Sequence, residues 1–261
     1  MTGAINEDLL NEVVALAERA GAVILDYYAK GTAVRTKADR TPVTDADEAA
    51  EAVIRPALES LLPGVPVVAE EAMARGAAPN ISQGRFWLVD PLDGTREFLS
   101  RNGEFTVNIA LVENGMPMLG VVHAPALALT FAARGPNTAA RKQGNSNFQK
   151  IEARPVPRDG AVVVASRSHG DPKALERFLS GIKVAGTMQA GSALKFGLIA
   201  SGEADLYPRF GRTMEWDTAA GHAVLLAAGG SVETLDGQPL RYGKKDFANP
   251  EFVARGRTQR N

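Results

Sequence analysis

Two aspartates stand three residues apart in the segment Val89–Thr95, which reads VDPLDGT. The apolar run before Asp90 predicts a buried strand, and the proline and glycine that follow predict a tight turn. In such a turn Asp90, Asp93 and the Leu92 carbonyl can converge on one point, and an all-oxygen site suits Mg²⁺. The helical stretch that Thr95 begins would offer free amides and a hydroxyl to an anion.

Further carboxylates end or begin other predicted elements. The pair Glu70-Glu71 follows a short apolar strand, and Asp47 and Asp217 each stand at a predicted helix start. Singly, each also fits a plain structural role, because acids are common at solvated strand ends and as helix caps. Turn chemistry alone can likewise account for an Asp-Pro and Asp-Gly segment.

The composition excludes several classes of protein. The chain has 261 residues, with 29 Lys and Arg against 30 Asp and Glu, for a formal net charge of -1. A long nucleic acid needs a basic surplus on its partner, so no such partner is expected. Cysteine is absent and only three histidines occur, so metal chemistry must depend on oxygen ligands. We interpret His123 and His222 as structural residues.

No segment resembles a targeting or membrane-spanning sequence. The first ten residues carry acids and no apolar core, and no apolar run is long enough to span a bilayer. We therefore expect a cytoplasmic protein without a transmembrane segment. Peripheral association with the inner face of the membrane stays open.

Helices and strands must hold these carboxylates in place. Apolar periodicity and stop signals predict helices over 5–30, from Thr44 to Pro63, and over 172–180, 192–200 and 217–228. Apolar runs predict strands over 65–69, 86–89, 105–112, 118–123, 129–133, 161–165, 183–188 and 204–210. The turns between the strands of 105–133 indicate an antiparallel meander.

The chain divides most naturally within a polar stretch, residues 134–160, which is rich in Gly, Asn, Arg and Pro. We predict an N-terminal α+β half, residues 1–157, that carries most acidic motifs. A C-terminal α/β half, residues 158–261, would complete the metal and substrate site. The fold class is thus a mixed α/β architecture with helices layered on sheets.

Four motifs, in this order, resemble signatures of the inositol monophosphatase superfamily of metal-dependent, lithium-sensitive phosphomonoesterases. They are Pro42–Asp47 (PVTDAD), Val68–Glu71 (VAEE), Asp90–Thr95 (DPLDGT) and Trp216–Gly221 (WDTAAG). Order and spacing agree from about residue 5 to residue 254, nearly the whole chain. The resemblance implies alternating helix and sheet layers, the αβαβα sandwich of the inositol monophosphatase and fructose-1,6-bisphosphatase type.

The resemblance also implies a set of metal ligands. Glu70, Asp90 and the Leu92 carbonyl would bind one Mg²⁺, while Asp90, Asp93 and Asp217 would bind a second. The scissile phosphate would bridge the two ions. Clustered carboxylates repel one another unless cations neutralise them, which is the physical reason for the acids to gather.

Catalytic roles follow from the same resemblance. Asp47 and Thr95 would orient and deprotonate the attacking water, and Glu70 would take part in catalysis as well as in metal binding. A third metal held by Asp47 and Glu70 stays open. The amides of Gly94 and Thr95 would hold phosphate oxygens.

Five further segments resemble the bacterial 3'(2'),5'-bisphosphate nucleotidases of this superfamily. They are Thr95–Phe98, Arg101–Ala110, Ser166–His169, Gly191–Phe196 and Tyr207–Gly211. These enzymes convert adenosine 3',5'-bisphosphate, a by-product of sulfate assimilation, to AMP and phosphate. A second phosphate needs cations that a monophosphate does not, and Lys195 and Arg209 are the candidates.

The expected substrate is therefore a small phosphorylated nucleotide. We predict that His169, Ser192, Lys195 and Arg209 bind its non-reacting part. The scissile phosphate would be contacted by Glu70, Leu92, Asp93, Gly94, Thr95 and Asp217.

Other functions remain open from sequence alone. The same chemistry could act on inositol monophosphate, histidinol phosphate or fructose 1,6-bisphosphate. A non-catalytic nucleotide- or RNA-binding protein is a further alternative, although near-zero net charge argues against RNA. A calcium-binding module of the EF-hand kind is disfavoured because no loop carries its alternating acids. Relatives are often homodimers, and the sequence does not decide the oligomeric state.

Overall fold

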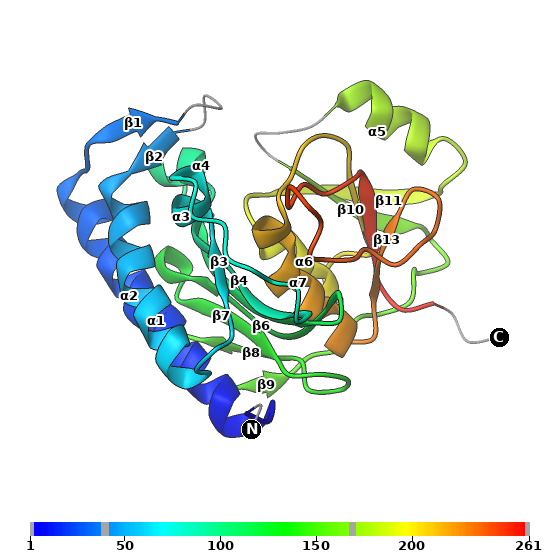
Figure 1. Cartoon of the computed structure of the whole chain (residues 1–261). Coiled ribbons are helices and arrows are strands. Elements are labelled where there is room, and N and C mark those ends of the chain that lie inside the picture. Colours follow the sequence, from blue (N-terminus) through cyan, green and yellow to red (C-terminus); the bar gives the residue numbers. More distant parts are fainter. Residues whose placement is uncertain (1–2, 38–41, 167–170, 259–261) are drawn as a thin grey trace.

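Five layers of helix and sheet stack on one another in the computed structural model, which describes residues 3–37, 42–166 and 171–258 (Figure 1). From the N-terminal side these layers are two long helices, a seven-stranded sheet, two central helices, a five-stranded sheet and one outer helix. The predicted αβαβα sandwich is confirmed.

The first layer consists of α1 (Glu7–Lys30) and α2 (Asp45–Leu61). Asn6 caps α1 by accepting a hydrogen bond from the Leu9 amide at 2.9 Å. The buried side chains of both helices face one side of the large sheet. A short antiparallel pair, β1 (Val34–Thr36) and β2 (Pro42–Thr44), leads from α1 to α2.

The seven-stranded sheet has the order β3-β4-β5-β6-β7-β8-β9. Its strands are β3 (Val67–Ala69), β4 (Arg85–Asp93), β5 (Thr106–Glu113), β6 (Met116–Ala124), β7 (Leu129–Ala133), β8 (Ala140–Gln143) and β9 (Gln149–Lys150). Strand β3 runs parallel to β4, and β4 to β9 pair antiparallel in sequence order. The predicted meander is confirmed. A one-turn 3-10 helix, Pro125–Leu127, connects β6 to β7.

Two sequence expectations about this sheet were wrong in detail. Strand β4 does not end before the Asp-Pro-Leu-Asp turn but continues to Asp93, with a register shift between Asp90 and Asp93. The polar stretch 134–160 is also not purely a connection, since β8 and β9 lie within it and extend the sheet. Hydrogen bonding to an existing edge thus outweighs the weak strand propensity of these polar residues.

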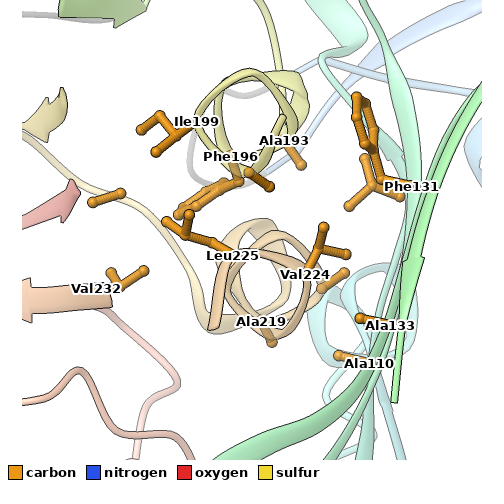
Figure 2. Close-up of a cluster of buried hydrophobic side chains, with 14 of the residues drawn as sticks. Ala110, Phe131, Ala133, Ala193, Phe196, Ile199, Ala219, Val224, Leu225 and Val232 are labelled. Carbon is orange, nitrogen blue, oxygen red and sulfur yellow. The ribbon is translucent and has the colours of Figure 1, made fainter. Parts of the chain in front are cut away.

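The central helices α6 (Leu194–Ala200) and α7 (Glu215–Ala227) lie between the two sheets. In Figure 2, Phe196 and Ile199 of α6 and Leu225 of α7 face one another, while Phe131 and Ala110 cover the helices from the large sheet. Close packing here requires small residues. A Cβ on Gly120 of β6 would lie 2.4 Å from the Ala220 carbonyl oxygen of α7.

The smaller sheet has the order β11-β10-β12-β14-β13. Its strands are β10 (Ala161–Ser166), β11 (Val184–Ala190), β12 (Leu206–Arg209), β13 (Ser231–Thr234) and β14 (Phe252–Arg255). Its outer face packs against α5 (Pro172–Leu179) through Phe178 and Leu179. Each sheet thus comes from one side of the predicted boundary near residue 157, and the division into halves stays a prediction.

Within the described part of the chain, no helix is both long and apolar enough to cross a membrane.

Candidate active site

The end of β4 carries the first two acids of the site. Asp90 lies opposite Asn108 of β5, and its Oδ1 accepts a hydrogen bond from the Leu92 amide at 3.0 Å. Asp93 Oδ2 accepts one from Asn108 Nδ2 at 3.1 Å. The register shift between the two aspartates occurs where the strand leaves the regular ladder, so both side chains are oriented by the turn and by β5.

Three carboxylates from different elements meet at this strand end. Because β3 and β4 are parallel and in register at Ala69 and Val89, Glu70 follows β3 beside Asp90. Asp217 reaches the same point from α7. One oxygen from each of Glu70, Asp90 and Asp217 lies within 4.8 Å of the others. The structure therefore brings together three of the acids that the sequence singled out.

These acids are in an environment that disfavours their negative charge. Burial, followed by repulsion from neighbouring carboxylates, raises the pKa values of Asp90 and Asp217 well above the usual range. Burial also raises the pKa of Asp93 to about 6, although Lys195 and Asn108 oppose the shift. A hard divalent cation would offset the repulsion between these carboxylates, and it prefers oxygen ligands such as theirs.

Asp47 and Thr95, to which the sequence analysis gave catalytic roles, are in direct contact. The Asp47 carboxylate is held by its own helix start, because Oδ2 accepts hydrogen bonds from the Thr44 amide at 2.8 Å and hydroxyl at 2.6 Å. Its other oxygen, Oδ1, accepts a hydrogen bond from the Thr95 hydroxyl at 3.3 Å. Burial raises the pKa of Asp47 to about 6. A carboxylate with this pKa and position can take a proton near neutral pH.

Gly94 joins the carboxylate turn to the short helix α4 (Thr95–Leu99). Its φ of 90° lies in the left-handed region that favours glycine. A Cβ here would stand 2.2 Å from Ser192 Oγ. That hydroxyl is within hydrogen-bond distance of the Asp93 and Glu104 carbonyl oxygens, at 2.8 and 2.7 Å. Ser192 thus connects the second half of the chain to the carboxylate turn.

The substitution Gly94→Ala is expected to damage both stability and turnover. The left-handed backbone alone costs about 1–2 kcal/mol for a residue with a Cβ. The contact with Ser192 would also displace the turn, and misplacement by an ångström can cost roughly 100-fold in rate. Thermal unfolding and kcat/KM measure the two effects. In the double variant with Ser192→Ala the steric part should be relieved; equal defects in both variants would contradict this account.

Buried cations line the same cavity as the acids. The cavity has a volume of about 810 Å³ and is lined by the acids together with Lys195 and Arg209. Lys195 Nζ donates to the Ser192 carbonyl at 2.6 Å, and burial lowers its pKa to about 8. Arg209 of β12 is 8% exposed and donates to the Arg212 carbonyl at 3.1 Å. The acids and these cations thus line one cavity.

Neither of the two histidines in the described part of the chain lines the cavity. His169 lies outside the described residues. His123 Nδ1 is 2.9 Å from Thr130 Oγ1, and His222 Nδ1 is 2.9 Å from Tyr242 Oη. Burial lowers their pKa values to about 4 and about 3, so both rings stay neutral. The structural interpretation of His123 and His222 agrees with these contacts.

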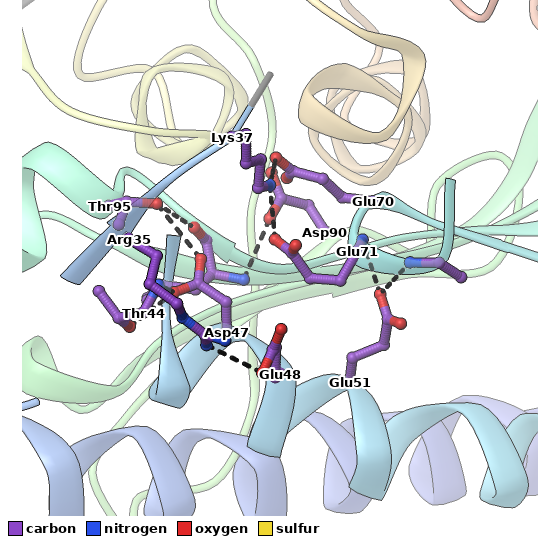
Figure 3. A network of polar contacts seen from close by, with 12 residues as sticks. Arg35, Lys37, Thr44, Asp47, Glu48, Glu51, Glu70, Glu71, Asp90 and Thr95 are labelled. Atoms are coloured by element: carbon purple, nitrogen blue, oxygen red, sulfur yellow. Dashed lines mark hydrogen bonds and ion pairs between the residues drawn. The ribbon is translucent and has the colours of Figure 1, made fainter. Parts of the chain in front are cut away.

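The sequence reasoning missed Lys37. In Figure 3 its ammonium group lies between Glu70 and Glu71, and Nζ is 2.6 Å from an oxygen of each. Burial lowers the pKa of Lys37 and the two acids raise it, with a net shift upward. Lys37 supplies positive charge to the acidic cluster from the β1 end. A single lysine outside the recognised motifs gives no signal in the sequence.

Glu51 was missed for the same reason. It lies one turn after Asp47 on α2 and is buried. Its Oε2 accepts hydrogen bonds from the Glu71 and Ala72 amides, at 2.8 and 3.2 Å (Figure 3). These amides belong to the first turn of α3 (Glu70–Ala74), so Glu51 caps the helix on which Glu70 stands.

Comparisons with known proteins agree with this geometry. The chain is 46% identical over 248 residues to 3'(2'),5'-bisphosphate nucleotidase CysQ of Escherichia coli K12, covering 94% of this chain and 98% of that protein. The CysQ structure from Bacteroides thetaiotaomicron superposes with a TM-score of 0.78 at 36% identity, covering 95% and 98% of the two chains. An inositol monophosphatase from Anabaena superposes with a TM-score of 0.74 at 27% identity, covering 95% and 90%. Residues 5–260 match the inositol monophosphatase family, and the chain belongs to that family.

Proposed function

We propose that this protein is a Mg²⁺-dependent 3'(2'),5'-bisphosphate nucleotidase that converts adenosine 3',5'-bisphosphate to AMP and phosphate. The observation that carries the proposal is a single cavity that is lined both by an acidic cluster and by two buried cations. A metal-binding cluster alone would suit any phosphomonoester. The buried Lys195 and Arg209 add a place for a second phosphate.

The acidic cluster would hold the metal. Glu70, Asp90, Asp93, Asp217 and the Leu92 carbonyl would supply the oxygen donors for two Mg²⁺ ions. When bound, the ions would lower the pKa of water and withdraw charge from the phosphoryl group. These donors lie on β4, α3 and α7.

Asp47 and Thr95 would accept the proton of the attacking water. The Thr95 hydroxyl donates its proton to Asp47 Oδ1 at 3.3 Å, and the Leu92 carbonyl oxygen is a second acceptor at 3.5 Å, so the hydroxyl lone pairs remain available to accept a hydrogen bond from water. A water beside Thr95 can pass its proton through the hydroxyl to Asp47. The water oxygen then bonds to phosphorus, the bond to the ribose 3'-oxygen breaks, and that oxygen takes up a proton.

Lys195 and Arg209 would bind the phosphate that does not react. Arg209 presents a planar guanidinium that suits a phosphate in a two-point arrangement. The Lys195 ammonium would attract the same phosphate, and it also has a structural role because it donates to the Ser192 carbonyl. Ser192 and Gly94 line the same cavity. They would contact the substrate.

Phosphate release from a panel of substrates tests this proposal. We expect the highest kcat/KM for adenosine 3',5'-bisphosphate, with lower values for adenosine 3'-monophosphate, inositol monophosphate, histidinol phosphate and fructose 1,6-bisphosphate. Turnover should require Mg²⁺ and fall when Li⁺ or Ca²⁺ is added. A preference for inositol monophosphate would overturn the assigned substrate, and turnover in EDTA would overturn the assigned metal.

A further inference from the structure

Glu215, at the first position of α7, has a carboxylate that the proposed reaction does not use. Its side chain is completely buried and does not line the cavity. It accepts hydrogen bonds from the amides of Gly243 and Lys244 at 2.6 and 2.9 Å, and it pairs with Lys244 Nζ at 2.7 Å. A buried carboxylate is costly without such donors. These contacts hold the segment 243–249 against the start of α7.

The segment held by Glu215 returns to the residue that precedes α7. The Glu215 amide donates to the Phe247 carbonyl at 2.8 Å. Asn249 Nδ2 donates to the Met214 carbonyl at 2.7 Å, and Met214 forms an antiparallel bridge with the same segment. The backbone of Met214 is therefore fixed from outside the helix by residues 243–249.

Met214 in turn fixes a residue of the acidic cluster. Its amide donates to Asp217 Oδ2 at 2.8 Å. A carboxylate has two oxygens, so Asp217 can accept this bond and still offer an oxygen to the cluster with Glu70 and Asp90. Any shift of Met214 would move the side chain of Asp217 relative to those two acids.

We propose that Glu215 is a positioning residue for the metal site. By holding the segment 243–249 on Met214, it orients the Asp217 carboxylate and increases the affinity of the acidic cluster for divalent cations. This inference rests on the proposed metal-dependent function, but it concerns a residue outside the cluster. Hydrogen-bonding partners behind a metal ligand commonly affect metal affinity by roughly 10–100-fold.

A purely structural role makes a different prediction. If Glu215 only anchored a surface segment, its replacement would lower the melting temperature and leave the affinity for metal unchanged in the folded protein. Asp205 provides a matched control, because it is also a completely buried carboxylate. It accepts hydrogen bonds from Arg154 Nε at 2.8 Å and from the Val162 amide at 2.7 Å, away from α7.

The test is direct binding of Mn²⁺, with free Mn²⁺ measured by electron paramagnetic resonance. Glu215→Gln keeps the shape of the side chain but places an amide nitrogen toward donors. We expect this variant to bind Mn²⁺ on the order of 10-fold more weakly than the wild type. Asp205→Asn should bind as the wild type does. Excess Mg²⁺ should restore most of the turnover of Glu215→Gln, as for a defect in metal affinity.

A second variant covers the case in which Glu215→Gln does not fold. Lys244→Met removes the cation and keeps the backbone amide, so it should weaken Mn²⁺ binding in the same direction by a smaller factor. Wild-type affinity in a folded Glu215→Gln, or in Lys244→Met alone if the first variant is unfolded, would overturn the role of Glu215. Equal weakening in Asp205→Asn would also overturn it. Absence of Mn²⁺ binding by the wild type would overturn the proposed metal function as well.

Discussion

Replacing Asp90 with Asn is expected to lower kcat/KM for adenosine 3',5'-bisphosphate by more than about 100-fold, because loss of a partner behind a metal ligand already costs roughly 10–100-fold. Asp90 belongs to the acidic cluster with Glu70 and Asp217 and is 2% exposed. Asparagine keeps an oxygen for the Leu92 amide but loses the negative charge. Initial rates of phosphate release at saturating Mg²⁺ measure the effect.

The same substitution should stabilise the metal-free protein. The pKa of Asp90 is raised by burial and by Glu70, Asp93 and Asp217, so ionised Asp90 works against folding at neutral pH. In EDTA at pH 7, Asp90→Asn should increase the free energy of unfolding, as measured by chemical denaturation. The gain should fade below about pH 4, where the folded and unfolded states both carry the proton.

Asp205→Asn again supplies the contrast. It removes a charge that Arg154 and the Val162 amide stabilise, so the expected loss is about 1–3 kcal/mol of stability with unchanged turnover. Asp90→Asn should lose activity without losing stability in EDTA. Retained activity in Asp90→Asn would refute the assignment of this residue to the metal.

Replacing Arg209 with Met is expected to change which substrate is preferred. A charge-assisted hydrogen bond contributes about 1.5–3 kcal/mol, and a tenfold change in affinity corresponds to about 1.4 kcal/mol. We therefore expect kcat/KM for adenosine 3',5'-bisphosphate to fall roughly 10- to 100-fold. The value for adenosine 3'-monophosphate, which lacks the second phosphate, should change little.

The ratio of the two kcat/KM values is the decisive measurement for Arg209. A variant that is merely misfolded loses both activities together, whereas loss of a phosphate contact lowers only the first. Arg209→Lys keeps a charge without the planar fork and should fall between the wild type and Arg209→Met. An unchanged ratio in Arg209→Met would place the second phosphate elsewhere in the cavity.

The acids at strand ends were predictable because their local signals are strong. Apolar runs stop just before Glu70 and Asp90, and parallel pairing of Ala69 with Val89 then brings the two acids together. The start of α7 was less predictable. We expected a helix from Asp217, but it begins at Glu215, two residues earlier. Its start depends on residues 243–249, which no local pattern connects to it.

The sequence analysis also missed side chains that act through contacts with residues distant in the sequence. Lys37 reaches Glu70 and Glu71 from a different element, and Glu51 caps a helix that starts after a long connection. The sequence around a lone lysine, or around a glutamate on an amphipathic helix, looks the same whether the side chain faces solvent or makes a buried contact. Tertiary packing decides between these outcomes, and one sequence does not contain that information.

The placement of Asp217 on the central helix α7 affects how the protein folds. The acidic cluster needs Glu70 and Asp90 from early in the chain and Asp217 from late in it. Bringing these distant residues together costs chain entropy before the site can bind metal. Assembly of the site should therefore be a late and slow step of folding. A nascent chain that has emerged only as far as β9 would hold part of the ligand set and gain no full metal-binding energy. Divalent cations should therefore mainly slow unfolding rather than accelerate folding.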